Sequence, residues 1–248
     1  MNAFVFPMAG NSSRFFKAGY AVPKYHLDIW GTTLFEASVR GFANYFEDDM
    51  FLFITRSDFE SSGFIKAEVE RLGIKNSHFA TVDGVTRGQA ETVYLGLEHA
   101  GINLSSNHPL IIFNIDTIRP DYHKPGFSTS NANFIEVTSL PGDHWSFAEV
   151  DEQGLVTRTT EKVRISDHCS TGVYGFESAK LFTHYFQAYA MEHENELYVA
   201  PMYNGLIKDN LNVKVDQVQR NEVHFCGTPS EYEALVKEPS PFDGKLYQ

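Results

Sequence analysis

Residues 3–14 read AFVFPMAGNSSR, and Pro23 and Lys24 follow in the same irregular segment. The apolar run at 3–8 predicts a buried strand that ends in a turn. Small residues after a strand expose consecutive backbone N–H groups, which can hold a triphosphate together with an Arg and a Lys. The loop matches neither GxxxxGK[ST] nor GxGxxG. It is therefore a candidate site of another kind, with an ordinary surface loop as the alternative.

Beyond this loop, segments with the hydrophobic spacing of helices alternate with continuous apolar runs typical of buried strands. Helical spacing predicts helices over 33–45, 65–72 and 89–100, the first capped by Thr32 or Thr33. Continuous apolar runs predict strands over 51–54, 78–82 and 110–115. Strands that alternate with helices and are apolar on both faces favour an α/β fold with a Rossmann-like, mainly parallel sheet.

From residue 134 the pattern becomes strand-rich. It predicts strands over 134–138, 147–150, 156–161, 169–176 and 213–215, and helices over 178–192 and 231–236. No repeat or linker separates the two parts, and a chain of 248 residues is expected to form one core. The sequence therefore predicts one domain, residues 1–248, with an α/β front half and a strand-rich back half.

The charge balance argues against nucleic acid as a partner. The chain carries 20 Lys and Arg against 32 Asp and Glu, a net charge of −12, whereas nucleic-acid binding calls for a basic face. Residues 1–27 contain Arg14, Lys17 and Lys24 but no acid, and the other 17 basic and 32 acidic residues give the rest of the chain −15. We expect a small anionic substrate to bind at this basic segment.

The two cysteines and the distribution of apolar residues indicate in which cellular compartment the protein is expected. Cys169 and Cys226 have no zinc-like spacing, so we expect a reducing environment without disulfides. The N-terminal apolar run lacks a basic n-region and breaks at Pro7, unlike a signal peptide, and no apolar run approaches the length of a membrane span. The expected location is the cytoplasm, with no membrane partner. The sequence leaves open whether the chain forms a homo-oligomer.

Residues 7–14 with Pro23-Lys24 resemble the signature of the sugar-phosphate nucleotidylyltransferase family, whose usual form is LAAGxGSR followed by PK. The longer pattern PMAGxSSRFxxAGYxxPKY is most similar to bacterial nucleotidylyltransferases from capsule and surface-polysaccharide clusters, and the likeness extends along nearly the whole chain. The resemblance implies a GT-A-like nucleotidyltransferase domain, with a nucleotide-binding half at 1–125 and an acceptor-binding half at 126–248.

The resemblance also implies how the nucleotide is held. The backbone of residues 9–14 and the Arg14 side chain would bind the triphosphate, and Lys24 would contact the α-phosphate or the attacking phosphate. Residues 86–90, TRGQA, are similar to the family's base-recognition segment, in which Gln89 would recognise the base edge; an exposed first-turn residue is the alternative. The residues expected to bind the nucleotide are Met8, Ala9, Gly10, Asn11, Ser12, Ser13, Arg14, Arg87, Gly88 and Gln89.

Asp116 is the candidate metal ligand. It follows the most apolar predicted strand, where open α/β sheets bind their ligands, and a carboxylate suits Mg²⁺; a loop or cap aspartate is the alternative. By resemblance it aligns with the family's magnesium aspartate, so Arg14, Lys24 and Asp116 are the expected catalytic residues. Many family members carry a second aspartate at the position of Phe225. Either one carboxylate suffices, or Asp216 or Glu222 substitutes, or activity is reduced.

The back half would bind the acceptor. Glu161-Lys162 and the segment CSTGVY at 169–174 resemble the family's EK…GxY pattern, in which the Glu binds acceptor hydroxyls and the Lys contacts the acceptor phosphate. Taken alone, a Glu-Lys pair is most often a solvated charge pair. The residues expected to bind the acceptor are Trp145, Glu161, Lys162, Thr171, Gly172 and Tyr198. Ser146 would also lie on the acceptor side, and Tyr203 and Asn204 resemble further positions of the acceptor lobe. For an aromatic such as Tyr198, packing in the core is the alternative.

These residues together predict a Mg²⁺-dependent nucleotidylyltransferase. A phosphate oxygen of the acceptor would attack the α-phosphorus of an NTP and release pyrophosphate. By analogy with the family, CTP or UTP/dTTP is favoured, and the acceptor is a sugar 1-phosphate or a small phosphorylated head group. Two alternatives stay open: a GT-A-type glycosyltransferase that uses residues 114–116 as a degenerate metal motif, and a catalytically silent nucleotide-binding homologue.

Overall fold

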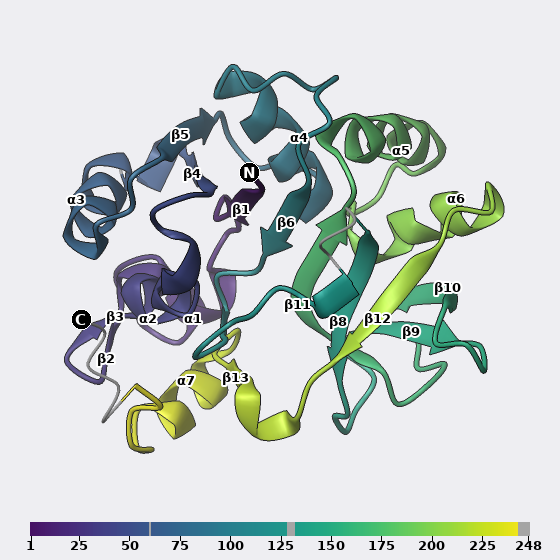
Figure 1. Ribbon diagram of the computed structural model, residues 1–248. Coiled ribbons are helices and arrows are strands. Elements are labelled where there is room, and N and C mark those ends of the chain that lie inside the picture. The colour runs from purple at the N-terminus through teal and green to yellow at the C-terminus, as the bar shows by residue number, and fades with distance from the viewer. Residues whose placement is uncertain (60, 128–131, 243–248) are drawn as a thin grey trace.

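The computed structural model, which describes residues 1–59, 61–127 and 132–242, contains a mixed sheet of nine strands (Figure 1). Its front half is parallel, in the order β6-β1-β4-β5. These strands are β1 (Ala3–Pro7), β4 (Met50–Arg56), β5 (Ser77–Val82) and β6 (Leu110–Phe113). Because they run in one direction, their carboxyl ends meet at one edge of the sheet.

Alternate side chains of β1 enter two separate cores. Ala3 and Val5 pack with apolar residues of α4 (Gln89–His99) and α5 (Ala179–Glu192). Phe4 and Phe6 pack with those of α2 (Leu34–Arg40) and α3 (Ser62–Leu72). A strand places successive side chains on opposite faces, so the continuous apolar runs in the sequence reflect a sheet covered on both sides.

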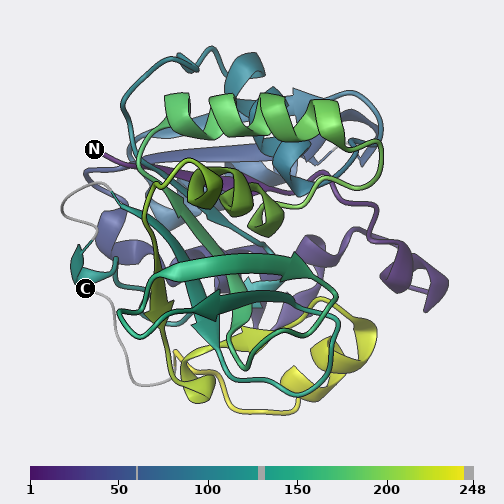
Figure 2. The ribbon, with the colours of Figure 1, turned by 90° about the vertical axis from the view of Figure 1, so that its right-hand side faces the viewer.

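The back half continues the sheet with antiparallel strands. Strand β11 (Cys169–Phe176) pairs antiparallel with β6 and with β8 (Asn133–Thr138), and β12 (Val213–Gln217) runs parallel to β8. A hairpin of β9 (Ser146–Val150) and β10 (Val156–Glu161) extends the edge. Helix α5 contacts α6 (Tyr203–Lys208), and both lie on the side turned to the viewer in Figure 2. The predicted α/β fold with a mainly parallel front sheet is confirmed.

The helix expected at 33–45 is shorter than predicted. Thr33 caps it, accepting the Glu36 N–H at 3.1 Å, but α2 ends at Arg40 and a short 3-10 turn, η2 (Ala43–Tyr45), follows. A Cβ at Gly41 would lie 2.0 Å from the carbonyl oxygen of Arg119, so the chain leaves the helix where it meets another backbone. Continuous helical spacing in the sequence did not reveal this contact.

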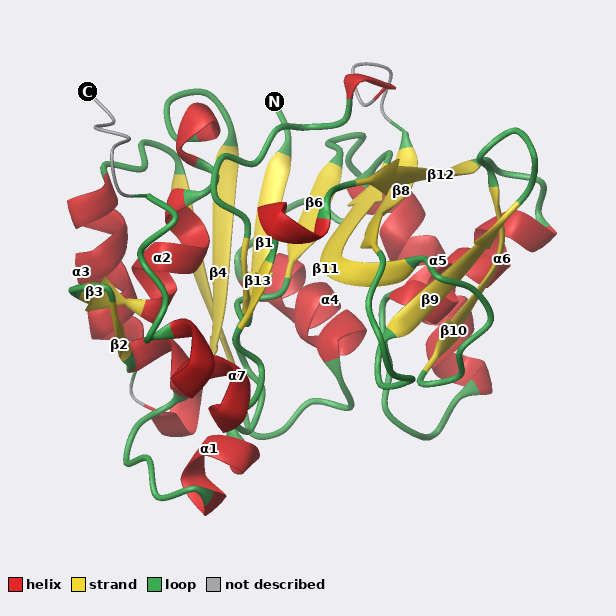
Figure 3. Ribbon diagram, turned by 90° about the horizontal axis from the view of Figure 1, so that it is seen from below, coloured by secondary structure: helices red, strands yellow, loops and turns green. Residues whose placement is uncertain are grey.

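The long loop after β1 contains structure that the sequence did not predict. Residues 13–17 form a short helix, α1 (Ser13–Lys17), and β2 (Asp28–Ile29) pairs with β3 (Thr32–Thr33). Phe15 of α1 packs against Tyr232 of α7 (Pro229–Leu235), with ring centroids 6.1 Å apart, and Figure 3 shows the two helices together. A second small pair joins β7 (Thr117–Ile118) to β13 (His224–Phe225). The C-terminal region therefore supports the loop.

Among the described residues, no helix combines the length and the apolar character needed to cross a lipid bilayer. Both cysteines are buried as free thiols.

Candidate active site

A cavity of about 850 Å³ opens at the carboxyl edge of the parallel strands, between the two halves of the sheet. It is lined by the loop after β1, the N-terminus of α4, the segment after β6, and parts of β9 to β11. The residues that the sequence analysis expected at the nucleotide, the acceptor and the metal line this one cavity, except the two further positions Tyr203 and Asn204. The structure thus brings the predicted residues together, and their individual roles stay predictions.

The loop after β1 presents unpaired backbone donors. The N–H groups of Gly10, Asn11 and Ser12 donate to no other residue in the described part of the chain. Ser12 has φ 46°, in the left-handed region, which accounts for the glycine usual at this position of the signature. Its hydroxyl accepts the Lys24 N–H at 3.3 Å and so ties both ends of the loop together. Such a row of donors beside Arg14 suits a phosphate chain.

Arg56, at the end of β4, is a support for this loop that the sequence analysis missed. Its guanidinium donates to the side-chain oxygen of Asn11 and, through Nε, to Asp58 at 2.5 Å. It also lies over the Phe59 ring, 4.1 Å from the centroid, and is only 6% exposed. An Arg at the end of a predicted strand was the only signal in the sequence.

Lys24 and Asp116 form an ion pair inside the cavity, with Nζ to Oδ2 at 2.8 Å. Burial by itself would raise the pKa of Asp116, but the charge and the hydrogen bond of Lys24 outweigh it and leave the pKa below its ordinary value. The backbone oxygen of Asp116 accepts the Cys226 N–H at 2.9 Å. The carboxylate is therefore ionised and held where the nucleotide loop meets β13.

Asp116 is also the residue that fits a metal. Among the described residues, no group of three or more His, Cys, Asp or Glu side chains is arranged to hold an ion. Mg²⁺ commonly binds through one or two carboxylates, with waters and substrate phosphates completing its shell. The cavity fits that arrangement, with Asp116 as the protein ligand and the open loop beside it for the phosphates.

Asp216 and Glu222, the suggested replacements for a second metal-binding carboxylate, do not line the cavity that contains Asp116. Phe225 pairs with Thr117, directly beside Asp116, and its ring lies 4.7 Å from that of Trp145. Asp216 lies on β12 opposite Glu136 and does not line the cavity. The Glu222 carboxylate caps the 3-10 turn η6 (Arg220–Glu222) by accepting the Gln219 N–H at 2.7 Å. The sequence could not show the positions of Phe225 and Asp216 because both depend on long-range strand pairing.

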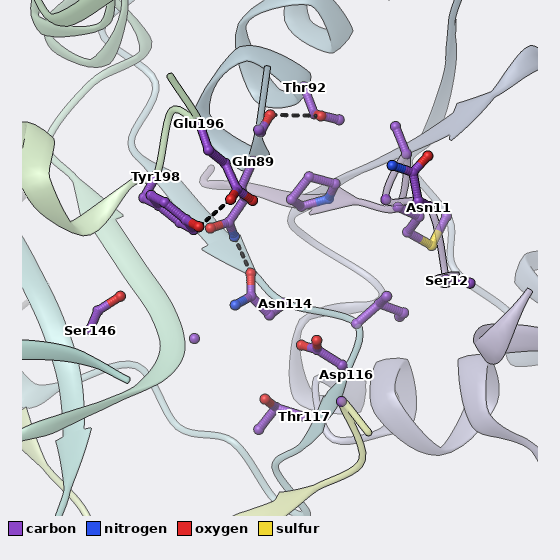
Figure 4. Close-up of a pocket in the computed structure, with 18 of the residues that line it drawn as sticks. Asn11, Ser12, Gln89, Thr92, Asn114, Asp116, Thr117, Ser146, Glu196 and Tyr198 are labelled. Atoms are coloured by element: carbon purple, nitrogen blue, oxygen red, sulfur yellow. Dashed lines mark hydrogen bonds between the residues drawn. The ribbon is translucent and has the colours of Figure 1, made fainter. Parts of the chain in front are cut away.

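The predicted base-recognition segment precedes α4. Gln89 is the first residue of the helix, and its amide nitrogen donates to the side-chain oxygen of Asn114 (Figure 4). Arg87 is engaged by Glu91, with Nε to Oε1 at 2.7 Å, so its guanidinium is already paired. Gln89 is therefore a held side chain of the cavity and not a free first-turn residue. Asn114, at the end of β6, was not among the predicted nucleotide residues.

The acceptor side centres on Glu161. Ser146 donates a hydrogen bond to the Glu161 carboxylate. Burial raises the pKa of Glu161, whereas the Ser146 hydrogen bond and the charge of Lys162 act to lower it. Lys162 has φ 56° and donates to the Tyr198 hydroxyl. Because Glu161 and Lys162 line the cavity, they are more than a solvated surface pair.

Other predicted acceptor positions have structural duties. Thr171 donates to the buried Glu136 at 2.6 Å. A Cβ at Gly172, where φ is +93°, would lie 2.9 Å from Asn114. Tyr203 is fully buried in the core, where its hydroxyl donates to the Phe134 oxygen, and Asn204 holds the backbone of β10. Tyr203 and Asn204 lie in the back half of the chain, but neither lines the cavity.

The parallel sheet, with a phosphate-suited loop and a lysine–aspartate pair at its carboxyl edge, fits the nucleotidyltransferase class. Solved structures agree with this class. A nucleoside-diphosphate-sugar pyrophosphorylase from Vibrio cholerae is 43% identical, with a TM-score of 0.89, and the match covers 95% of this chain and 100% of that one. The chain belongs to the sugar-phosphate nucleotidylyltransferase family and is a nucleotidyltransferase of the pyrophosphorylase type.

More distant structures share the fold. A UTP-bound UDP-glucose pyrophosphorylase from Acinetobacter baumannii is 17% identical with a TM-score of 0.71, over 95% of this chain and 92% of that one. The inositol-1-phosphate CTP transferase of T. maritima is 14% identical with a TM-score of 0.69, over 96% of each. No protein-family model matches the chain, and no curated protein sequence matches it.

Proposed function

We propose that this enzyme is Mg²⁺-dependent and transfers a nucleoside monophosphate from CTP, UTP or dTTP to a phosphorylated acceptor, with release of pyrophosphate. The observation that carries the proposal is the convergence of Lys24 and Asp116, 2.8 Å apart, on the open backbone loop of residues 10–12. The carboxylate and the lysine stand between that loop and the acceptor side of one cavity.

The chemistry needs no general base, because the attacking phosphate oxygen is already an anion. The loop N–H groups and Arg14 would hold the triphosphate, and Lys24 would offset the repulsion between two anionic substrates. When bound, the metal would supply Lewis-acid polarisation of phosphate oxygens. Asp116 would hold it, and Gln89 would recognise the base. Positioning and charge neutralisation therefore account for the catalysis.

A sugar phosphate is the favoured acceptor. The Vibrio cholerae relative is described as a nucleoside-diphosphate-sugar pyrophosphorylase, and its 43% identity extends over both halves of the chain. Glu161 would accept hydrogen bonds from acceptor hydroxyls, and Lys162 would contact the acceptor phosphate. In this proposal residues 1–125 bind the nucleotide, residues 126–248 bind the acceptor, and the product is an activated precursor for a capsule or surface polysaccharide.

A substrate matrix tests the proposal. CTP, UTP, dTTP, ATP and GTP are each combined with hexose 1-phosphates, phosphocholine and other phosphorylated head groups, with Mg²⁺, and pyrophosphate release is measured. We expect release with a pyrimidine nucleotide and a sugar 1-phosphate. A parallel set of reactions supplies an NDP-sugar in place of the NTP, and its consumption without pyrophosphate release would support the glycosyltransferase alternative. Nucleotide binding without turnover across the matrix would support a silent homologue.

A further inference from the structure

The segment Glu196–Tyr198, which follows α5, connects the two halves of the cavity. Leu197 is fully buried in the core, whereas Glu196 and Tyr198 on either side of it line the cavity. Figure 4 shows the Glu196 and Tyr198 side chains meeting, and the Tyr198 hydroxyl donates to the Glu196 carboxylate. Leu197 therefore anchors the segment in the core, while its two neighbours face the cavity.

Leu197 ties this segment to the predicted base-recognition loop through its backbone. Its N–H donates to the Arg87 oxygen at 2.7 Å, and its oxygen accepts the Ala90 N–H at 3.0 Å. A Cβ at Gly88, where φ is +145°, would lie 2.5 Å from the Leu197 oxygen. The loop and the segment therefore pack backbone against backbone, and Gly88 permits this approach.

Tyr198 ties the other side of the segment to Lys162. The lysine donates to the Tyr198 hydroxyl, and its Nζ lies 4.5 Å from the centroid of the ring. Lys162 has left-handed backbone angles and its N–H donates to the Trp145 oxygen at 2.9 Å. A side chain that is about half exposed, at 52%, would otherwise sample many rotamers. Contact with both the ring and the hydroxyl of Tyr198 favours one of these rotamers.

We propose that Tyr198 is a positioning residue for Lys162. We also propose that residues 196–198 form a bridge, a structural connection through which the conformation of the predicted base-recognition loop affects the position of Lys162. The inference rests on the proposed function, since it takes Lys162 as the group that meets the acceptor phosphate. Tyr198 then acts on the acceptor through Lys162, although it lines the same cavity. The base-recognition loop influences Lys162 without touching it.

A double-mutant cycle tests the first part. Acceptor KM, nucleotide KM and kcat are measured for wild type, Tyr198→Phe, Lys162→Ala, the double variant, and Tyr94→Phe, a control tyrosine between α4 and α5. Tyr198→Phe keeps the ring and removes the hydroxyl. We expect a rise of about tenfold in acceptor KM, a nucleotide KM within about twofold, and a double variant no worse than Lys162→Ala. Effects that multiply in the double variant, or no effect of Tyr198→Phe, would overturn the proposal.

A second measurement needs no substrate. Acylation of Lys162 by acetic anhydride is followed by peptide mass spectrometry, with the exposed Lys208 as internal reference. We expect Lys162 to react at least about threefold faster in Tyr198→Phe and in Gly88→Ala, and at the wild-type rate in Tyr94→Phe. Unchanged acylation in Tyr198→Phe would remove the positioning role, and unchanged acylation in Gly88→Ala would remove the bridge. If no substrate pair in the matrix releases pyrophosphate, the proposed function fails, while this measurement still decides the bridge.

Discussion

Lys24 Nζ lies 2.8 Å from Asp116 Oδ2, although 92 positions separate the two residues in the chain. The lysine follows the irregular loop after β1, and the aspartate follows β6, the parallel neighbour of β1. Because parallel neighbours end at the same edge, the two charges meet in the cavity at that edge. This pair is the centre of the proposed chemistry.

Lys24→Ala is expected to lower kcat on the order of 100-fold or more, because it removes one electrostatic stabiliser of the phosphate charges. Asp116→Ala should have an effect of similar size. Steady-state pyrophosphate release with saturating Mg²⁺ measures both. Lys17→Ala is the matched control, since Lys17 is an exposed lysine of the same basic segment that does not line the cavity. Near-wild-type turnover of Lys24→Ala would remove its assigned role.

Arg56→Lys is expected to raise the nucleotide KM roughly tenfold, with a smaller change in acceptor KM. Lysine keeps the charge but lacks the planar fork of the guanidinium, in which separate nitrogens donate to Asn11 and to Asp58. A lost hydrogen bond to a charged group costs about 1.5–3 kcal/mol. Because about 1.4 kcal/mol corresponds to a factor of ten in affinity, the lower end of this range gives roughly a tenfold change. Arg158→Lys, on the exposed side of β10, serves as the control. Equal nucleotide KM values in both variants would show that Arg56 does not support the loop.

Asp49→Asn is expected to lower the free energy of unfolding by about 1–2 kcal/mol at neutral pH. Burial favours a raised pKa for Asp49, but the Asn2 N–H at 2.6 Å and Lys124 Nζ at 2.9 Å reverse this and lower it below 3.8. The stabilisation by the carboxylate is therefore present above the ordinary pKa and is lost as the pH falls through the folded-state value.

Urea unfolding of wild type and Asp49→Asn at about pH 7 and about pH 3 measures this dependence. We expect the difference between the two proteins to shrink at the lower pH. A difference that is the same at both pH values would mean that the charge of Asp49 contributes nothing.

Gly41→Ala is expected to destabilise the fold by about 3 kcal/mol, because the new Cβ would lie 2.0 Å from the Arg119 oxygen. Gly63→Ala is a matched control within α3, where nothing lies within 4 Å of the added Cβ, and it should stabilise by about 0.5–1 kcal/mol. Thermal unfolding of the two variants measures the contrast. Similar midpoints for both would show that the backbone near Gly41 can move aside.

Local patterns in the sequence predicted most of the strands and helices. The runs that became β1 and β6 are apolar throughout, and Thr33 with Glu36 capped the helix as expected. The end of that helix was missed because it is set by the distant Arg119. Helix α1 was missed because its stability depends on Phe15 packing against Tyr232, which no local period can show.

The residues of the candidate site also fall into those that local sequence patterns indicate and those that only long-range contacts reveal. The signature residues and Asp116 stand at element ends, so the sequence could indicate them. Arg56 and Asn114 were missed because they contact Asn11 and Gln89, which are far from them in the chain. Tyr198 lines the cavity whereas Tyr203 is buried in the core, and a local pattern cannot separate two such tyrosines. The role of Phe225 depended on its pairing with Thr117, which only the structure shows.

The most direct test of the central claim follows the α-phosphorus itself. The enzyme is incubated with α-³²P-labelled CTP or UTP, Mg²⁺ and the sugar 1-phosphate that gives turnover, and the products are separated by chromatography. The account predicts label in a nucleoside-diphosphate-sugar, unlabelled pyrophosphate in equal amount, and loss of both in Lys24→Ala. Label recovered in free nucleotide, or a nucleotide-linked product formed without pyrophosphate, would contradict it.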